Sequence, residues 1–216
     1  MGATGILPAT GRPPPAARQD DMDALPILGL DLDGVLVRPP LGWNMAISRR
    51  LALPPLPAEV PPLRLDTRWQ RSYWLARAGF EVARYLGRRP LPGVAEALAA
   101  LATVRRLEVV SSRRWLVRPL VRRWLERHGL APYIAAIHLN DRPLRGPQFK
   151  LWLLRDRGIA EHVDDDGATA FYLASRGIAT VYLCDWPRNR GLPYPAGVRR
   201  VRGLPDVAAL LAARRG

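Results

Sequence analysis

The sequence predicts an α/β fold in which helices cover both faces of a parallel β-sheet. Short apolar runs alternate along the chain with stretches whose apolar residues recur at helical spacing. Short buried strands that alternate with amphipathic helices imply parallel strands joined by right-handed crossovers. The 216 residues are 48% hydrophobic and 24% charged, which is the balance of a globular protein with a sizeable core. Fibrous and wholly disordered classes are excluded by this composition.

Each apolar run or helical pattern defines one expected element. The strands are expected at Ile27–Asp33, Leu107–Ser111, Ile134–Leu139, Ala160–Asp164 and Ala179–Cys184. The helices are expected at Pro92–Leu101, Pro119–His128, Gln148–Arg157, Ala168–Arg176 and Pro205–Ala213. Proline in a first helical turn is well tolerated, because its missing N–H would have no partner there.

Two segments stand outside this alternation. Residues 1–25 contain Pro13-Pro14-Pro15 and lack hydrophobic periodicity, which predicts a disordered tail. Residues 38–89 are Pro-rich in their first half and then follow a helical pattern over Leu65–Gly87. A connection of that length usually is functional or forms a small subdomain. We therefore expect a core of residues 26–37 and 90–216, with residues 38–89 as a small, mainly helical insert after the first strand.

The chain is strongly basic, with 33 Lys and Arg against 19 Asp and Glu and a net charge of +14. Such a charge suits a nucleic-acid partner or an anionic substrate. The arginines are scattered, however, and Lys150 is the only lysine, a pattern that is also typical of genome-wide composition bias. The charge therefore leaves both interpretations open.

Compartment and membrane association are constrained by simple counts. Cys184 is the only cysteine, so an intrachain disulfide is impossible and a reducing compartment fits best. The longest uncharged stretch is about a dozen residues, whereas a membrane-spanning helix needs about 20. No basic region followed by an apolar stretch opens the chain, so no secretory signal is expected. These observations predict a cytoplasmic protein without a membrane partner.

The candidate functional residues lie at the ends of predicted strands, where open α/β sheets bind their ligands. The first strand ends in Asp31 and Asp33, which point the same way in extended backbone, and Gly34 allows the turn that follows. A later strand ends in Asp164, Asp165 and Asp166. Clustered carboxylates repel each other unless a cation lies between them, and an oxygen-only set suits Mg²⁺.

Four motifs at these positions resemble the signatures of the haloacid dehalogenase-like (HAD-like) phosphatases. The run from Asp31 to Leu36 resembles the first signature, and Ser111 after Val109-Val110 resembles the second. Lys150 matches the basic third signature, and Val163-Asp164-Asp165 matches the acidic fourth. The four occur in the family's order over roughly residues 26–216. The resemblance implies a HAD-like, Rossmann-like core with a cap formed by residues 38–89.

The resemblance also implies a mechanism for phosphomonoester hydrolysis. Asp31 would attack phosphorus and form an aspartyl-phosphate. Asp33 would protonate the leaving oxygen and then deprotonate the hydrolytic water. Lys150 would neutralise charge near the nucleophile and bind phosphate, and its compact ammonium suits a crowded oxygen site.

Metal and phosphate ligands follow from the same resemblance. The expected Mg²⁺ ligands are Asp31, the backbone carbonyl of Asp33, and Asp164 or Asp165. The expected phosphate-binding residues are Ser111, Ser112, Arg113 and Lys150. Ser112 can equally be a neighbouring cap, and Asp166 is favoured as a helix cap over a metal ligand. The isolated His128, His138 and His162 fit no metal spacing and are interpreted as structural.

The substrate class is the least constrained inference. Pro187-Arg188-Asn189-Arg190 and Ser111-Ser112-Arg113 partly resemble segments of 5'-nucleotidase-like members, which favours a nucleotide or another small phosphorylated metabolite. The alternative is a nucleic-acid-end phosphatase or a nucleic-acid-binding protein, suggested by the +14 charge. No signature of a nucleic-acid-binding module is evident, and the sequence predicts no particular oligomeric state.

Overall fold

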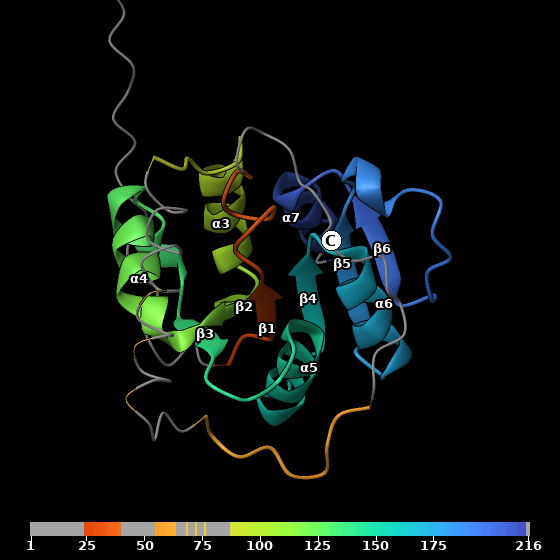
Figure 1. Ribbon diagram of the computed structural model, residues 1–216. Helices are drawn as coiled ribbons and strands as arrows, with labels where there is room; N and C mark the ends of the chain where they lie inside the picture. Colours follow the sequence, from red (N-terminus) through yellow and green to blue (C-terminus); the bar gives the residue numbers. More distant parts are fainter. Residues whose placement is uncertain are drawn as a thin grey trace, which may run out of the picture.

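The computed structural model describes residues 24–39, 55–63 and 87–214, together with Arg68, Ser72 and Ala76. These residues form a six-stranded parallel sheet of order β3-β2-β1-β4-β5-β6 (Figure 1). The strands are β1 (Ile27–Leu30), β2 (Arg106–Arg114), β3 (Ala136–Asn140), β4 (Glu161–Asp164), β5 (Thr180–Cys184) and β6 (Val198–Val201). The helices are α3 (Val94–Ala102), α4 (Arg118–Arg127), α5 (Gly146–Asp156), α6 (Gly167–Ser175) and α7 (Leu204–Ala212).

The strand order reverses direction beside β1. From β1 the chain moves outward through β2 and β3, and it then returns to the other side of β1 for β4, β5 and β6. The register places Leu30 opposite both Val109 and Val163, and the N–H of Asp31 donates to the carbonyl of Val163 at 3.0 Å. In open α/β sheets, ligands bind outside the carboxyl ends of the strands at such a reversal.

Alternating side chains of the strands fill two separate apolar layers. Val109 packs in the cluster that includes residues of α3, α4 and α7, whereas Val110 packs with residues of α5 and α6. In β5, Tyr182 belongs to the first layer and Leu183 to the second. Since both faces of the sheet are covered, neighbouring residues of a strand are both buried, and β1 and β5 are mainly apolar runs instead of alternating ones. Cys184 is buried in the first layer, where it acts as a small core residue.

The predicted fold class is confirmed, and all ten expected elements are present with shifted ends. One strand, β6, was not predicted. Its sequence is Val-Arg-Arg-Val, and the two central arginines are exposed at the edge of the sheet, so no apolar run marks it. The second strand also differs, because β2 continues past Ser111 as far as Arg114 and carries three further polar residues beyond the end of β1.

The ends of the insert leave and re-enter the core at neighbouring points. The N–H of Arg38 donates to the carbonyl of Arg89, and the N–H of Leu91 donates to the carbonyl of Leu36, both at 2.9 Å. Val37 and Pro90 form an isolated antiparallel bridge between these two ends. Because the two ends of the insert are hydrogen-bonded to each other, its length can differ without disturbing the sheet.

Residues 55–63 of the insert lie against the start of α5 and the loop before it. Gln148 donates to the carbonyl of Pro55 at 3.3 Å, Arg142 donates to the carbonyl of Val60 at 3.1 Å, and the N–H of Leu63 donates to the carbonyl of Asp141 at 2.8 Å. Arg68, Ser72 and Ala76 are helical and exposed. The rest of the helix expected at Leu65–Gly87, and all but the end of the tail expected at residues 1–25, lie outside the described residues.

Within the described part of the chain, the structure contains no helix that is both long and apolar enough to cross a membrane.

Candidate active site

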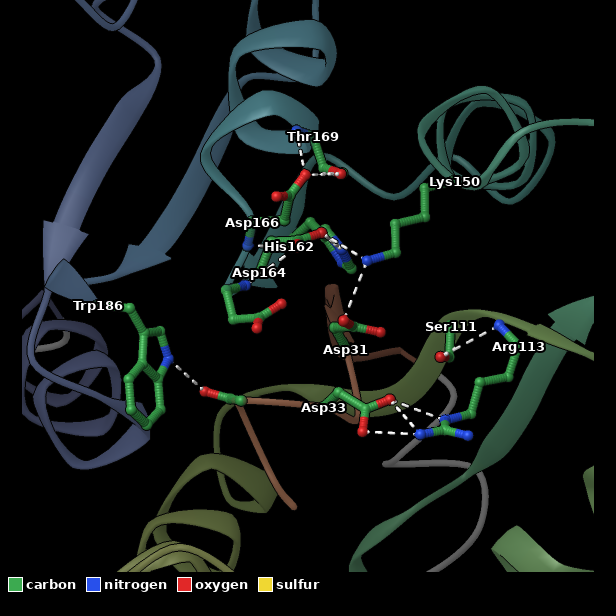
Figure 2. Close-up of polar contacts among 12 residues, drawn as sticks. Asp31, Asp33, Ser111, Arg113, Lys150, His162, Asp164, Asp166, Thr169 and Trp186 are labelled. Atoms are coloured by element: carbon green, nitrogen blue, oxygen red, sulfur yellow. Dashed lines mark hydrogen bonds and ion pairs between the residues drawn. The ribbon is translucent and has the colours of Figure 1, made fainter. Parts of the chain in front are cut away.

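Three predicted site residues meet at the carboxyl ends of β1 and β4, where the strand order reverses (Figure 2). Asp31 follows β1, Asp164 ends β4, and Lys150 reaches them from α5. Nζ of Lys150 lies 2.7 Å from Oδ2 of Asp164 and 3.2 Å from Oδ2 of Asp31. All three residues are buried, with at most 6% of their surface exposed. The sheet therefore brings together residues that are far apart in the sequence.

Lys150 keeps its charge because of these carboxylates. Burial by itself lowers the pKa of a lysine, but Asp164 and Asp31 outweigh burial and raise the pKa of Lys150 above its ordinary value. Helical spacing puts Lys150 on the buried side of α5 with Phe149 and Leu154 in the same layer. An apolar layer thus holds the stem of the side chain, while its ammonium reaches the polar end of the strands.

Asp164 accepts hydrogen bonds at both of its carboxylate oxygens. Oδ1 accepts hydrogen bonds from the N–H groups of Asp165 and Asp166, each at 3.0 Å. Oδ2 accepts from Lys150, and Nε2 of His162 lies 3.0 Å from the same oxygen. Although burial raises the pKa of Asp164, Lys150 and His162 hold it well below its usual range. Asp164 therefore remains an ionised carboxylate inside the protein.

Asp165 is oriented by the turn that follows β5. Arg188 donates to the carbonyl of Asp165 at 2.8 Å and to Oδ2 of its side chain at 2.9 Å. Nδ2 of Asn189 donates to the carbonyls of Asp165 and Cys184, both at 2.9 Å. These two residues of the short 3-10 turn Pro187–Asn189 therefore tie the loop after β4 to the end of β5.

Asp166 has a different role from its two neighbours. It is the N-cap of α6, and its Oδ2 accepts from the N–H of Thr169 at 2.8 Å and from the Thr169 hydroxyl at 2.7 Å. The expectation that Asp166 caps a helix is confirmed. The cap starts α6 directly after the site, and this arrangement positions the loop that carries Asp164 and Asp165.

The donor set fits a divalent cation. Oxygen atoms of Asp31, Asp164 and Asp165 all lie within 4.8 Å of one another. Oδ1 of Asp31 is buried and has no hydrogen-bond partner among the described residues. Burial raises the pKa of Asp31, Lys150 opposes this, and the neighbouring Asp164 and Asp33 add to the rise. A cation held by these oxygens would offset the repulsion and favour the ionised form of Asp31.

Asp33 lies beside this cluster, and its carboxylate is turned toward Arg113 (Figure 2). Nε of Arg113 donates to Oδ2 at 2.7 Å, and NH1 of Arg88 donates to Oδ1 at 2.7 Å. The turn expected after Asp33 is present, because Gly34 has φ of 71° and Leu36 N–H returns to the carbonyl of Leu32. Nε1 of Trp186 donates to the carbonyl of Gly34 at 3.1 Å and connects this turn to the end of β5.

Three of the four residues predicted to bind phosphate belong to β2, and their side chains lie in different surroundings. Ser111 is buried at 1% exposure, and its Oγ lies 3.5 Å from the N–H of Arg113. Ser112 is exposed on the opposite face of β2, where it lies against Gly146 of α5. The guanidinium of Arg113 lies on Asp33.

Four further residues contact the site, and none of them was assigned to it from the sequence. They are Arg88, His162, Arg188 and Asn189. His162 could have been found, since it lies two residues before Asp164 in a strand and so faces the same way. Arg88 could not, because arginines are abundant everywhere in the chain and its partner is 55 residues away.

No protein-family model matches the sequence, and no curated protein matches it. Solved structures do match. A haloacid dehalogenase-like hydrolase from Streptococcus pneumoniae has a TM-score of 0.54 at 14% identity, covering 88% of this chain and 99% of that one. A predicted phosphoglycolate phosphatase from Haemophilus somnus has a TM-score of 0.55 at 17% identity, with 86% and 97% covered. A HAD-superfamily hydrolase from Geobacter sulfurreducens has a TM-score of 0.52 at 18% identity, with 87% and 96% covered.

These matches extend over nearly the whole length of each solved structure, and their low identity makes them evidence about the fold. The chain has the fold of the haloacid dehalogenase-like hydrolases.

Proposed function

We propose that this protein is a Mg²⁺-dependent phosphomonoester hydrolase that acts on a small phosphorylated metabolite through an aspartyl-phosphate at Asp31. One observation carries the proposal. Asp31 is buried where the strand order reverses, with Oδ2 near Lys150 and Oδ1 without a partner among the described residues. A carboxylate that is enclosed, oriented and left with an unused oxygen is suited to act as a nucleophile.

The first half of the reaction transfers the phosphoryl group to Asp31. A carboxylate oxygen of Asp31 forms a bond to phosphorus while the bond between phosphorus and the ester oxygen breaks. This step begins with Asp33 protonated. Asp33 gives its proton to the departing oxygen, so that a neutral alcohol leaves, and the carboxylate that results is the form that Arg113 and Arg88 hold. Lys150 balances negative charge beside Asp31, and the hydroxyl of Ser111 donates to a phosphoryl oxygen.

The second half releases the product and restores the protein. Asp33, now ionised, takes a proton from a water molecule whose oxygen attacks phosphorus. The bond between phosphorus and Asp31 breaks, and inorganic phosphate leaves. Asp33 again carries a proton, so that the residues return to their starting forms.

Asp31, Asp164 and Asp165 would hold the Mg²⁺, together with the backbone carbonyl of Asp33. When bound, the cation supplies positive charge that offsets repulsion between the carboxylates and the phosphate. Arg188 and Lys150 keep the side chains of Asp165 and Asp164 in place for this role, through the contacts of 2.9 Å and 2.7 Å described above.

The finer substrate class is also proposed. The name of the Haemophilus somnus structure describes a phosphatase of a small organic phosphate, which supports a small metabolite. The segment that resembles 5'-nucleotidase-like members includes Arg188 and Asn189, and both hold the loop of Asp165. That likeness therefore supports a common site architecture, and nucleotides belong in the substrate panel beside sugar phosphates and short acid phosphates.

The test is hydrolysis of 4-nitrophenyl phosphate in the presence of Mg²⁺, followed by the panel of metabolites. Asp31→Asn keeps the shape of the side chain but removes the nucleophile, so its rate should fall by at least about a thousandfold. Asp165→Asn should raise the Mg²⁺ concentration needed for half-maximal activity, while Asp166→Asn, which preserves the helix cap, should leave it unchanged. An Asp31→Asn variant with near-wild-type turnover would refute the proposal.

A further inference from the structure

Two arginines hold the carboxylate of Asp33 by three hydrogen bonds. Nε of Arg113 donates to Oδ2 at 2.7 Å, and NH2 of the same guanidinium donates to Oδ1 at 2.8 Å. NH1 of Arg88 donates to Oδ1 at 2.7 Å. The paired contacts of Arg113 form a fork that fixes the plane of the carboxylate as well as its distance (Figure 2).

Both arginine side chains are more deeply buried than the carboxylate they contact. The side chains of Arg113 and Arg88 are 5% and 8% exposed, whereas that of Asp33 is 31% exposed. A half-exposed aspartate beside a turn would otherwise exchange between rotamers in contact with water. The buried guanidinium groups therefore restrict the side chain of Asp33.

The two arginines come from parts of the fold that are held firmly. Arg113 lies in the part of β2 that continues past the end of β1, within a register irregularity bounded by Ser111 and Arg114, both of which pair with β3. Arg88 lies at the point where the insert re-enters the core, and its carbonyl accepts from Nε1 of Trp124 in α4 at 3.0 Å. The pair thus bridges Asp33 to the sheet on one side and to the root of the insert on the other.

We propose that Arg113 and Arg88 are positioning residues that aim Asp33 at the ester oxygen of a phosphate bound to Asp31. This inference rests on the proposed function and adds to it. Proton transfer needs the carboxylate within hydrogen-bond reach of the oxygen, and a misplacement of about 1 Å costs up to a hundredfold in rate. Arg113 holds Asp33 through its Nε and Nη2 groups. These are the same groups that a bidentate contact to phosphate would use.

The experiment compares two aryl esters that differ in how much they need protonation of the leaving oxygen. Phenyl phosphate releases a basic phenolate and needs the proton, whereas 4-nitrophenyl phosphate releases a stable one and needs it little. For Arg113→Gln we expect kcat/KM to fall about tenfold on 4-nitrophenyl phosphate and about a hundredfold on phenyl phosphate. The inhibition constant of inorganic phosphate should differ by less than about twofold between Arg113→Gln and the wild type, because the substitution leaves the phosphate site intact.

Three further variants separate positioning from other roles. Arg88→Gln should lower kcat/KM selectively on phenyl phosphate in the same way but by a smaller factor, since Arg88 donates to Asp33 from Nη1 at 2.7 Å, whereas Arg113 donates from both Nε and Nη2. Arg113→Lys keeps the charge without the fork and should lie between wild type and Arg113→Gln. Arg105→Gln removes a comparable arginine, whose Nε lies 2.7 Å from Glu161 near the amino end of the sheet, and should leave the ratio between the two esters unchanged.

Each outcome decides the proposal. Equal losses on both esters with weaker inhibition by phosphate would make Arg113 a phosphate ligand and overturn the inference. Unchanged kcat/KM on both esters in Arg113→Gln and Arg88→Gln would overturn the inference as well. If Arg113→Gln fails to fold, the ratio of kcat/KM between the two esters in Arg113→Lys and Arg88→Gln decides instead. A wild-type protein that hydrolyses neither ester would overturn the proposed function and the inference with it.

Discussion

Lys150 is surrounded by carboxylates, with its ammonium 2.7 Å from Asp164 and 3.2 Å from Asp31. The ion pair is fully inside the protein, so neither partner can recover its hydration if the other is removed. The single lysine of the chain is therefore a structural residue in addition to its proposed role in the reaction. An arginine would bring a larger, planar head into the same space, although the charge would be kept.

Replacing Lys150 with methionine should destabilise the protein by roughly 3 to 5 kcal/mol, because two buried carboxylates lose their counter-charge. Added Mg²⁺ should recover part of that loss in the free energy of unfolding, since the same oxygens would hold the cation. Lys150→Arg is the control that keeps the charge, and it should lose less stability but most of the activity. Thermal unfolding with and without MgCl₂ measures this, and a methionine variant as stable as wild type would contradict it.

At the scale of elements, the site depends on how closely β1 approaches β4 and α5. Gly29 in β1 has no side chain, and a Cβ there would lie 2.7 Å from Nδ1 of His162 and 3.3 Å from Leu154. His162 in turn contacts Asp164 through Nε2. The glycine therefore provides the room in which the histidine reaches the carboxylate.

Gly29→Ala should cost roughly 1 to 3 kcal/mol in the free energy of unfolding, because the added methyl group forces His162 or the strand to move. Activity should fall as well, since a displaced His162 no longer orients Asp164. The cost should largely vanish when His162 is alanine, so chemical denaturation of the two single variants and the double variant measures the coupling. Additive costs in the double variant would show that His162 is not the obstacle.

Across the whole molecule, Glu108 connects three elements at a distance from the site. It is a fully buried residue of β2, and it lies 2.7 Å from Nε2 of His138 in β3 and accepts from Arg157 after α5 at 3.0 Å. Burial raises the pKa of Glu108, but the hydrogen bonds from His138 and Arg157 outweigh it and leave the pKa lowered. A carboxyl group whose pKa is lower in the folded state than in the unfolded state stabilises the fold when the pH is above its unfolded-state pKa. This stabilisation is lost as the pH falls through the folded-state pKa.

The free energy of unfolding should therefore decrease as the pH falls below about 4.5, the ordinary pKa of Glu108. Glu108→Gln should be less stable at neutral pH by roughly 1.5 to 3 kcal/mol, the range for hydrogen bonds to charged groups. Its stability should also decline less steeply in acid than that of the wild type. Urea denaturation at a series of pH values tests this, and parallel acid limbs in the two proteins would exclude a contribution from Glu108.

The sequence by itself determined the class of fold, the order of ten elements and the main residues of the candidate site. It did so because strands buried on both faces, such as β1 and β5, leave short apolar runs, and because ligands in such sheets bind where the strands end. Asp31, Lys150 and Asp164 were all predicted, and they meet within hydrogen-bond or ion-pair distance. The edge strand β6 escaped prediction because two exposed arginines interrupt its pattern.

Only the tertiary structure decided which partners the charged side chains choose. Arg113 is predicted to bind phosphate, and in the structure its guanidinium lies on Asp33, where it is joined by Arg88, which is 55 positions away from Asp33 in the chain. In a chain with one lysine among its 33 basic residues, arginine carries no positional signal of its own. The pairing arises from the path of the insert back into the core and from the extra length of β2. Both depend on packing between distant segments, which no local pattern of residues encodes.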